Sequence, residues 1–360
     1  MMASRTCALL ALLLSSAISR AADAPLYRET FDADTGGWVA FDPAQAAPTQ
    51  QTAVAHQGGA LQARYEAKDK GLPYILGRAE LPSLTGAKSF RFWLATSHDT
   101  VMAIILQEPG GARYVSAFAS YAGRWQHVEV SVDRLRLADD TTDDNGKLDL
   151  DKLAGLALAD LSSVLPVAKQ PPGARVLWLD DVEVDTTPAP TAYSADGALP
   201  YVLDDFAADY VTWLALGGRL TRDAPTKTLV WTYPAQVPAG SLPAAVDLVG
   251  MLPAQGAANV VITLASKLAR QVGICLQEEN RPARPERTFI SAVTLKGGDA
   301  EETLTLPLTG FVLDEKDRAK GDGPLRLELV NRLAILDAEV LGGQAQGENT
   351  LRIREVRLTK

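Results

Sequence analysis

The sequence repeats itself once, and this internal repeat constrains the fold more than any other feature. "FRFWLATSHDTVMAIILQE" at 90–108 aligns without a gap to "VVITLASKLARQVGICLQE" at 260–278, and both stretches end in Leu-Gln-Glu. The other matched pairs are 29–38 with 204–213, 146–160 with 323–337, and 177–184 with 351–358. The spacing between partners stays at 170–177 residues. A repeat of this length indicates a duplicated domain, because the units of solenoid proteins are far shorter.

The repeated unit consists of short strand-like runs that Gly, Pro and Asp separate. The clearest of these runs are 88–95, 100–107, 126–132 and 175–184. They are rich in β-branched and aromatic residues, and helical periodicity is scarce, which is typical of all-β sandwiches and barrels. A proline-rich stretch separates the matched halves. We therefore predict two tandem β-sandwich domains over 25–187 and 200–360, joined by a linker at 188–199.

The N-terminal residues have the pattern of a secretory signal peptide. Arg5 precedes the apolar stretch "CALLALLLSSAI" at 7–18, and small residues follow it. We predict a signal peptide over 1–21 and an exported protein that is periplasmic or secreted. No later run approaches the ~20 apolar residues that span a bilayer, so we expect no transmembrane segment after cleavage. Cleavage removes Cys7 and leaves Cys275, which we expect to be a buried, inert thiol because its neighbours are apolar.

Charge and residue content argue against several classes of function. The formal charge is −9, and an acidic chain repels phosphate backbones, so we expect no nucleic-acid partner. His56, His98 and His127 form no metal-binding spacing with one another or with cysteine. The sequence contains neither a Gly-x-Ser-x-Gly elbow nor a glycine-rich phosphate loop. We therefore predict that the protein is not an enzyme.

The acidic stretch "DDTTDDNGKLDLDKL" at 139–153 resembles a calcium loop of the EF-hand type at first sight. With Gly146 at the sixth loop position, however, Thr141 stands first and Lys152 stands last. An EF-hand requires a carboxylate first and a bidentate glutamate last. We interpret the stretch as a solvated turn at Asn145-Gly146 that leads into a strand over 147–151, with its leucines pointing inward.

Two tryptophans are candidates for stacking on a sugar. Strand parity places Phe90 and Phe92 on one face of a predicted strand and Trp93 on the other, and Trp125 lies opposite the face formed by the valines of 126–132. The alternative is that both tryptophans pack under loops or between layers, as large aromatic residues commonly do.

A second group of candidates combines aromatic and hydrogen-bonding side chains. It consists of Tyr74, Arg78, Gln107, Glu108 and Tyr114. Tyr74 and Arg78 are four residues apart, so they share a strand face. The pair at 107–108 recurs as Gln-Glu at 277–278. This recurrence indicates a structural role for at least one of the two residues.

Several motifs together resemble a known family. They are Phe31-Asp32 followed by Gly37-Trp38, "ILQEPGGARY" at 105–114, "GRWQHVEVSV" at 123–132, "DDNGKLDLDKLAGLALAD" at 143–160 and the closing "LWLDDVEV" at 177–184. In combination they resemble the galactose-binding-like jelly rolls of carbohydrate-binding modules, close to family 11 and to the complex I intermediate-associated protein 30 type. The resemblance covers 25–187 and extends to 200–360 mainly through the internal repeat.

The resemblance implies a jelly-roll fold in each half, a carbohydrate or glycoconjugate ligand, and a structural calcium ion in domain 1. The implied calcium ligands are Glu29 in the first strand and Asp180 or Asp181 in the last. The second half places Arg354 where Asp180 stands, which argues against a second calcium site. We expect a non-catalytic binding protein that uses domain 1. The rival interpretation is a scaffold that docks another protein at the cell envelope, and an enzyme with an unrecognised site is a third.

Overall fold

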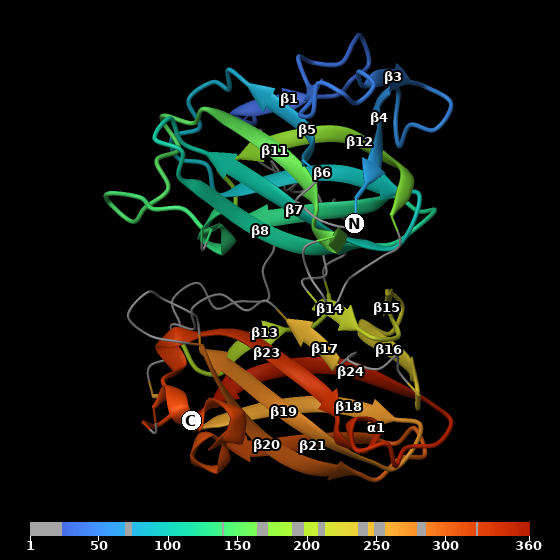
Figure 1. Ribbon diagram of the computed structural model, residues 1–360, viewed down its shortest axis with the longest axis vertical. Helices are drawn as coiled ribbons and strands as arrows, with labels where there is room; N and C mark the ends of the chain where they lie inside the picture. Colours follow the sequence, from blue (N-terminus) through green and yellow to red (C-terminus); the bar gives the residue numbers. More distant parts are fainter. Residues whose placement is uncertain are drawn as a thin grey trace, which may run out of the picture.

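The computed structural model consists of two β-sandwiches that follow each other along the chain (Figure 1). It describes residues 24–68, 74–138, 140–163, 172–188, 198–207, 213–236, 244–247, 256–278, 286–321 and 323–360. The predicted signal peptide and residues 189–197 of the predicted linker lie outside these ranges. None of the helices in the described ranges has the length and apolar character needed to cross a membrane.

Domain 1 is built from two antiparallel sheets. Sheet A has the order β3 (Thr49–Gln51), β4 (Ala60–Ala67), β12 (Gly173–Asp185), β6 (Ser89–Thr96) and β9 (Gln126–Ser131), with β1 (Tyr27–Glu29) also paired to β12. Sheet B has the order β10 (Arg136–Leu137), β8 (Arg113–Ser120), β7 (Thr100–Gln107), β11 (Gly155–Asp160), β5 (Tyr74–Ala79) and β2 (Val39–Ala40). The four runs that the sequence indicated as strands correspond to β6, β7, β9 and β12.

Domain 2 repeats this topology strand for strand. Sheet C has the order β15 (Arg219–Asp223), β16 (Thr228–Pro234), β24 (Glu348–Thr359), β18 (Asn259–Ser266) and β21 (Glu301–Pro307), with β13 (Tyr201–Asp204) paired to β24. Sheet D has the order β14 (Trp213–Leu216), β17 (Ala244–Asp247), β23 (Val330–Asp337), β19 (Arg270–Glu278), β20 (Arg287–Leu295) and β22 (Val312–Leu313). The predicted fold class, two tandem β-sandwiches, is confirmed.

Helical structure in the described residues is limited to short segments between strands. They are the 3-10 turns η1 (Val132–Arg134), η2 (Leu161–Ser163), η4 (Leu308–Gly310), η5 (Glu315–Lys320) and η6 (Leu327–Leu329), and α1 (Ala338–Leu341). Alternation along the strands forms the cores between the sheets. In β6, for example, Phe90, Phe92 and Leu94 are buried, whereas Arg91 and Trp93 face the solvent side. Burial of such apolar side chains supplies the main stabilisation.

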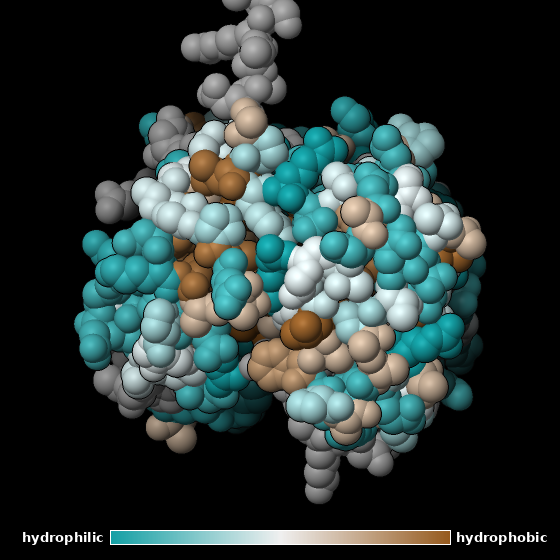
Figure 2. All heavy atoms as spheres, turned by 90° about the horizontal axis from the view of Figure 1, so that it is seen from above, coloured by the Kyte–Doolittle hydropathy of each residue, from teal (hydrophilic) through white to brown (hydrophobic). Residues whose placement is uncertain are grey.

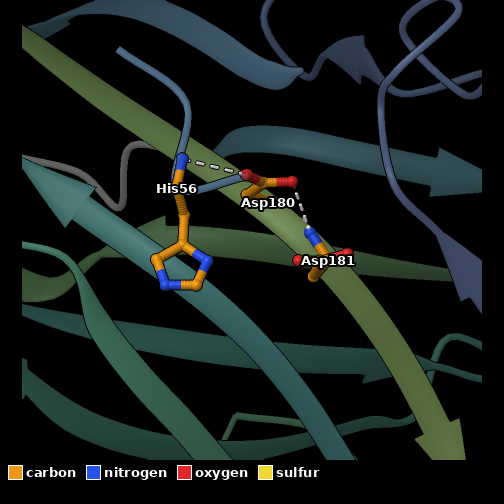
Figure 3. A group of neighbouring side chains, drawn as sticks. All are labelled: His56, Asp180 and Asp181. Atoms are coloured by element: carbon orange, nitrogen blue, oxygen red, sulfur yellow. Dashed lines mark hydrogen bonds between the residues drawn. The ribbon is translucent and has the colours of Figure 1, made fainter. Parts of the chain in front are cut away.

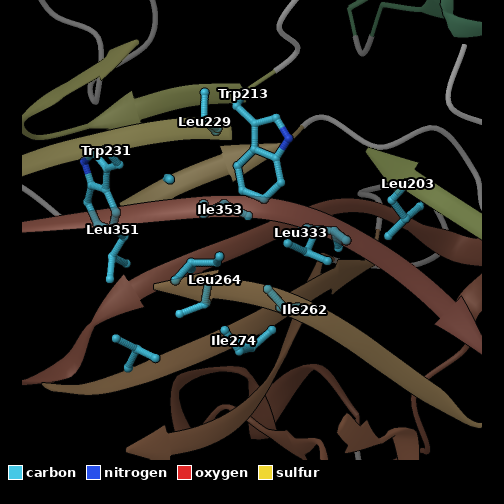
Figure 4. Packing of buried hydrophobic residues seen from close by; sticks show 14 of the residues in the cluster. Leu203, Trp213, Leu229, Trp231, Ile262, Leu264, Ile274, Leu333, Leu351 and Ile353 are labelled. Carbon is cyan, nitrogen blue, oxygen red and sulfur yellow. The ribbon is translucent and has the colours of Figure 1, made fainter. Parts of the chain in front are cut away.

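The core of domain 2 extends to residues of domain 1. Trp213, Trp231, Leu264 and Ile353 are among the fully buried side chains of this core (Figure 4). Its buried cluster continues into three residues of domain 1. They are Val101 near the start of β7, Ala119 near the end of β8, and Tyr121 directly after β8. Arg219 at the start of β15 also lies 3.9 Å from Asp99. The two sandwiches therefore share an apolar contact.

The acidic stretch differs from its prediction in one respect. Leu148 and Leu150 are partly buried against the core of domain 1, as expected, and Gly146 has a φ of +66°. Residues 147–151, however, form no strand. They are held as a loop, because Glu108 Oε1 accepts a hydrogen bond from the Asp149 N–H at 2.6 Å. The next strand, β11, begins only at Gly155.

Candidate functional site

Four aromatic rings gather on the solvent face of sheet A. Trp93 on β6 is the register partner of His127 on β9, and their ring centroids are 4.9 Å apart. His56 comes from the connection between β3 and β4, and it stacks on Trp93 with centroids 3.7 Å apart and planes 12° from parallel. Trp125 meets His56 edge to face at 6.0 Å. The structure thus brings both candidate tryptophans to one surface and adds two histidines. We call these four residues the ring cluster.

The β3–β4 connection, residues 52–59, carries His56 over this face because a buried carboxylate holds it there. Asp180 of β12 is fully buried, and its Oδ2 accepts hydrogen bonds from the backbone N–H groups of His56 at 3.1 Å and Gln57 at 3.0 Å. A second tie forms where Gly59 donates its N–H to Oδ1 of Asp32 at 2.8 Å. The adjacent Gly58 has a φ of +65°, and a Cβ there would lie 2.0 Å from the same oxygen. The position therefore requires glycine.

The ring cluster combines aromatic surface with polar groups. His56 is exposed, while Trp93, Trp125 and His127 are partly exposed. His56 covers one face of Trp93, so the alternative interpretation, in which the tryptophans pack under loops, is correct for that face. Next to the cluster on β6, Arg91 forms ion pairs with Glu129 at 3.0 Å and Asp185 at 2.8 Å. The arrangement therefore offers ring faces and edges with fixed hydrogen-bonding groups beside them.

Sequence reasoning missed two members of this surface. His56 lies 37 residues before Trp93, and no periodicity connects a loop histidine with a strand tryptophan. Trp178 of β12 also faces outward, because its neighbours Leu177 and Leu179 belong to the core. The alternation of "RVLWLDDVEV" contained this second signal, since Trp178 has the opposite parity to both leucines.

The residues predicted to hold calcium are engaged with other partners. Glu29 lies 3.7 Å from Arg78 and accepts a hydrogen bond from the Phe31 N–H at 3.3 Å. Asp181 lies 3.7 Å from Arg28. Asp180 accepts from three backbone N–H groups, those of His56 and Gln57 on Oδ2 and that of Asp181 on Oδ1 at 2.8 Å. Figure 3 shows the bonds from His56 and Asp181. Burial raises the pKa of Asp180.

The donor set at this position also differs from the predicted one. The side chains of His56, Asp180 and Asp181 offer ligand atoms within 4.8 Å of one another, and Glu29 is not in this group. Calcium prefers six to eight oxygen ligands and does not favour imidazole nitrogen. The residues present therefore do not fit the calcium ion that the family resemblance implies.

The members of the second candidate group whose side chains the structure describes do not form one site. Tyr114 is buried and donates its hydroxyl to Asp143 Oδ2 at 2.6 Å, which ties the acidic loop to β8. Glu108 is buried against the same loop, whereas Gln107 is exposed at the end of β7. Arg78 lies with its guanidinium carbon 5.2 Å from the ring centroid of Tyr27, beside Glu29. Tyr74 begins β5, and its side chain lies outside the described part of the structure.

Comparison with known proteins finds similarity only among solved structures. No protein-family model matches the chain, and no curated protein sequence matches it. The structure is similar to the family 11 carbohydrate-binding module of the cellulosomal cellulase Lic26A-Cel5E of Clostridium thermocellum, at 14% identity and a TM-score of 0.34, over 45% of this chain and 96% of that one. It is also similar to the tandem CBM22-1–CBM22-2 domain of Paenibacillus barcinonensis Xyn10C, at 12% identity and a TM-score of 0.30, over 94% and 99%.

A third similar structure is a single-residue variant of a family 29 module in complex with mannohexaose. The identity is 14% and the TM-score 0.26, over 44% of this chain and 89% of that one.

Proposed function

We propose that the protein is an exported, non-catalytic binding protein that binds carbohydrate through the ring cluster of domain 1. The observation that supports this proposal is the convergence of Trp93, Trp125, His56 and His127 on one solvent face. Indole rings provide flat apolar area on which the CH face of a pyranose packs, and they carry little side-chain entropy to lose. The Arg91–Glu129 pair beside the cluster supplies a fixed donor and acceptor for sugar hydroxyls.

Binding to an oligosaccharide panel tests the proposal. Suitable probes are β-1,3-1,4-mixed-linked tetrasaccharide, mannohexaose and xylohexaose, the ligands in solved complexes of similar modules. We expect at least one to quench tryptophan fluorescence, and Trp125→Ala to weaken its binding about tenfold or more, which corresponds to ~1.4 kcal/mol. The matched control is Phe41→Ala, because Phe41 is an exposed aromatic residue, 49% accessible, at the edge of sheet B. Equal effects of the two substitutions, or no binding to any probe, would refute the proposal.

Protein docking is the second candidate function, and a different surface favours it. Domain 1 viewed from above is mostly hydrophilic, with separate hydrophobic patches (Figure 2). Val39 and Phe41, at the edge strand β2, are 57% and 49% exposed. Exposed apolar residues on a sheet edge are a common site of protein association. A partner of this kind would bind the Phe41→Ala variant weakly and the Trp125→Ala variant normally, which is the opposite ranking to that expected for a sugar.

A further inference from the structure

The solvent face of sheet C in domain 2 contains a polar depression of about 390 Å³. Thr263 of β18, Glu301 and Thr303 of β21, and Arg354 and Glu355 of β24 line it. This volume lies at the lower end of the range for small-molecule sites.

The depression occupies the place that the ring cluster occupies in domain 1. Thr263 aligns with Trp93 in the gapless part of the repeat. Thr303 is the register partner of Thr263, just as His127 is the register partner of Trp93. His127 and Thr303 lie on equivalent edge strands, because β21 occupies in sheet C the position that β9 occupies in sheet A. The two faces are therefore equivalent in the fold but different in chemistry.

Two changes in the sequence open this space in domain 2. In domain 1 the β3–β4 connection has eight residues, 52–59, and it covers Trp93 with His56. The equivalent β15–β16 connection has four residues, 224–227. The indole of domain 1 is also replaced by the smaller side chain of Thr263. A shorter loop and a smaller strand residue leave unfilled the volume that the loop and ring occupy in domain 1.

Among the described residues, the lining provides hydrogen-bond donors and acceptors but no aromatic surface. The Thr263 and Thr303 hydroxyls lie 3.3 Å apart, so each retains capacity for another partner. Arg354 and Glu301 form an ion pair at 3.0 Å, which leaves this part of the wall without net charge. Lys227 lies at the same depression. Its ammonium group forms no ion pair with any residue in the described ranges.

From this geometry we propose that the depression is a second binding site, for one neutral sugar unit held by hydrogen bonds to its hydroxyl groups. The Arg354–Glu301 pair and the threonine hydroxyls match a ligand that carries hydroxyls and no charge. Asp205 and Lys227, which also line the depression, carry opposite charges. The absence of aromatic side chains among the lining residues distinguishes this site from a stacking platform. The inference concerns domain 2 alone and does not depend on the sugar-binding proposal for domain 1.

Saturation-transfer NMR on the full chain tests this site with D-glucose, D-galactose, D-mannose and D-xylose as separate probes. The Trp93→Ala, Trp125→Ala background removes the contribution of domain 1. We expect at least one probe to show transfer in this background. Thr263→Trp restores the ring that domain 1 carries at this position, and it should fill the depression and weaken binding about tenfold or more. The matched control, Thr294→Val on an exposed position of β20 in sheet D, should leave binding unchanged.

A second variant keeps the test valid if Thr263→Trp fails to fold. Thr303→Val removes one hydroxyl of the lining at nearly constant volume, and it should also weaken binding. Thermal unfolding of each variant verifies that the fold is retained. Absence of transfer from all four sugars overturns the proposal, and so does transfer that folded Thr263→Trp and Thr303→Val variants leave unchanged. In either case the result leaves the domain 1 proposal standing, because that proposal is measured with intact tryptophans.

Discussion

Two carboxylates in domain 2 stand where domain 1 has an ion pair, and this exchange leads to a pH-dependent stability. Glu29 is the register partner of Val182. Asp204 is the register partner of Val356, the residue that corresponds to Val182 in the repeat. Arg78 is the register partner of Leu156, and Asp247 is the register partner of Leu333, the residue that corresponds to Leu156 in the repeat. The Glu29–Arg78 pair of domain 1 is thus replaced by Asp204 and the fully buried Asp247.

Asp204 retains its proton to an unusually high pH. Burial and the negative charge of Asp247 raise the pKa of Asp204 to about 7, although Phe206 N–H at 2.8 Å and Trp213 Nε1 at 3.1 Å donate hydrogen bonds to its carboxylate. Arg134 of domain 1 opposes the rise. An aspartate in the unfolded chain titrates near pH 3.9.

The direction of the pH effect follows from this difference. The folded state binds the proton more tightly than the unfolded state, so the stabilisation is complete below about pH 4 and is lost as the pH rises through about 7. A difference of about 3 pKa units corresponds to at most ~4 kcal/mol. Asp204→Asn removes the titrating group, so its free energy of unfolding should not show this loss.

Urea unfolding of the full chain from about pH 4 to about pH 8 measures the effect. We expect the difference in unfolding free energy between Asp204→Asn and the parent protein to shift in favour of the variant as the pH rises. Asp247→Asn should reduce the slope in the same way, because it removes the second charge. Asp299→Asn serves as a control, because Asp299 is an exposed carboxylate in the same domain that pairs with Arg352. A difference between Asp204→Asn and the parent protein that stays constant with pH would refute the reasoning.

Three further outcomes are expected. Arg175→Met should cost about 3–5 kcal/mol in urea unfolding, because it leaves the fully buried Asp160 without its ion pair at 2.6 Å; a cost below ~1 kcal/mol would contradict this. Asp143→Ala should lower the urea midpoint more than Asp144→Ala, since only Asp143 accepts the Tyr114 hydroxyl, and equal midpoints would show that this hydrogen bond contributes nothing. Calcium should leave the melting temperature unchanged, whereas a rise that a chelator reverses would establish the metal site that we find ill-fitted.

The sequence predicted the fold well because the features that specify it are local or repeated. Alternation along the strands marks the core face of β6 and β9, and the internal repeat links the two topologies. The recurrence of Glu108 as Glu278 correctly indicated a structural role. Glu108 Oε1 accepts the Asp149 N–H at 2.6 Å, and Glu278 Oε1 accepts the Arg326 N–H, the equivalent position, at 2.9 Å.

The candidate site was predicted only in part, because its remaining members depend on long-range packing. Trp93 and Trp125 could be placed on an outer face by strand parity alone. His56 reaches them because Asp180, 124 residues away in sequence, holds its backbone. Arg78 could not be placed either, because β5 has buried residues of both parities, Ile75 and Leu76, and parity then does not distinguish the faces.

Domain 1 contains a buried polar network around Asp160 that strand parity alone does not predict. Asp160 of β11 is fully buried, and it accepts hydrogen bonds from Tyr65 Oη at 2.8 Å, Thr100 Oγ1 at 2.6 Å and Arg175 Nη1 at 2.6 Å. Burial alone raises the pKa of this carboxyl, but the hydrogen bonds outweigh it and hold the pKa below its usual value. The network connects sheet A to sheet B across the sandwich.

Domain 2 builds the same network with the cation moved to another strand. Asp337 accepts the Tyr233 hydroxyl at 2.8 Å and lies 3.4 Å from Arg270 Nε. Arg270 aligns with Thr100 of the first network. Asn349 aligns with Arg175, and it donates a hydrogen bond to the Tyr233 hydroxyl at 2.8 Å. The arginine has thus moved from the last strand of the domain to the strand equivalent to β7, while the tyrosine and aspartate have stayed in place.

The contrast between the interior and the solvent face separates structural constraint from function in this duplicated protein. The carboxylate of this network is paired with an arginine in both domains, even though the strand that carries the arginine has changed. The solvent face is under no such constraint. There the Trp93 and His127 of domain 1 correspond to two threonines in domain 2, although both faces keep the same backbone register. Divergence at equivalent exposed positions on a preserved scaffold gives the two domains different solvent faces, aromatic in domain 1 and polar in domain 2.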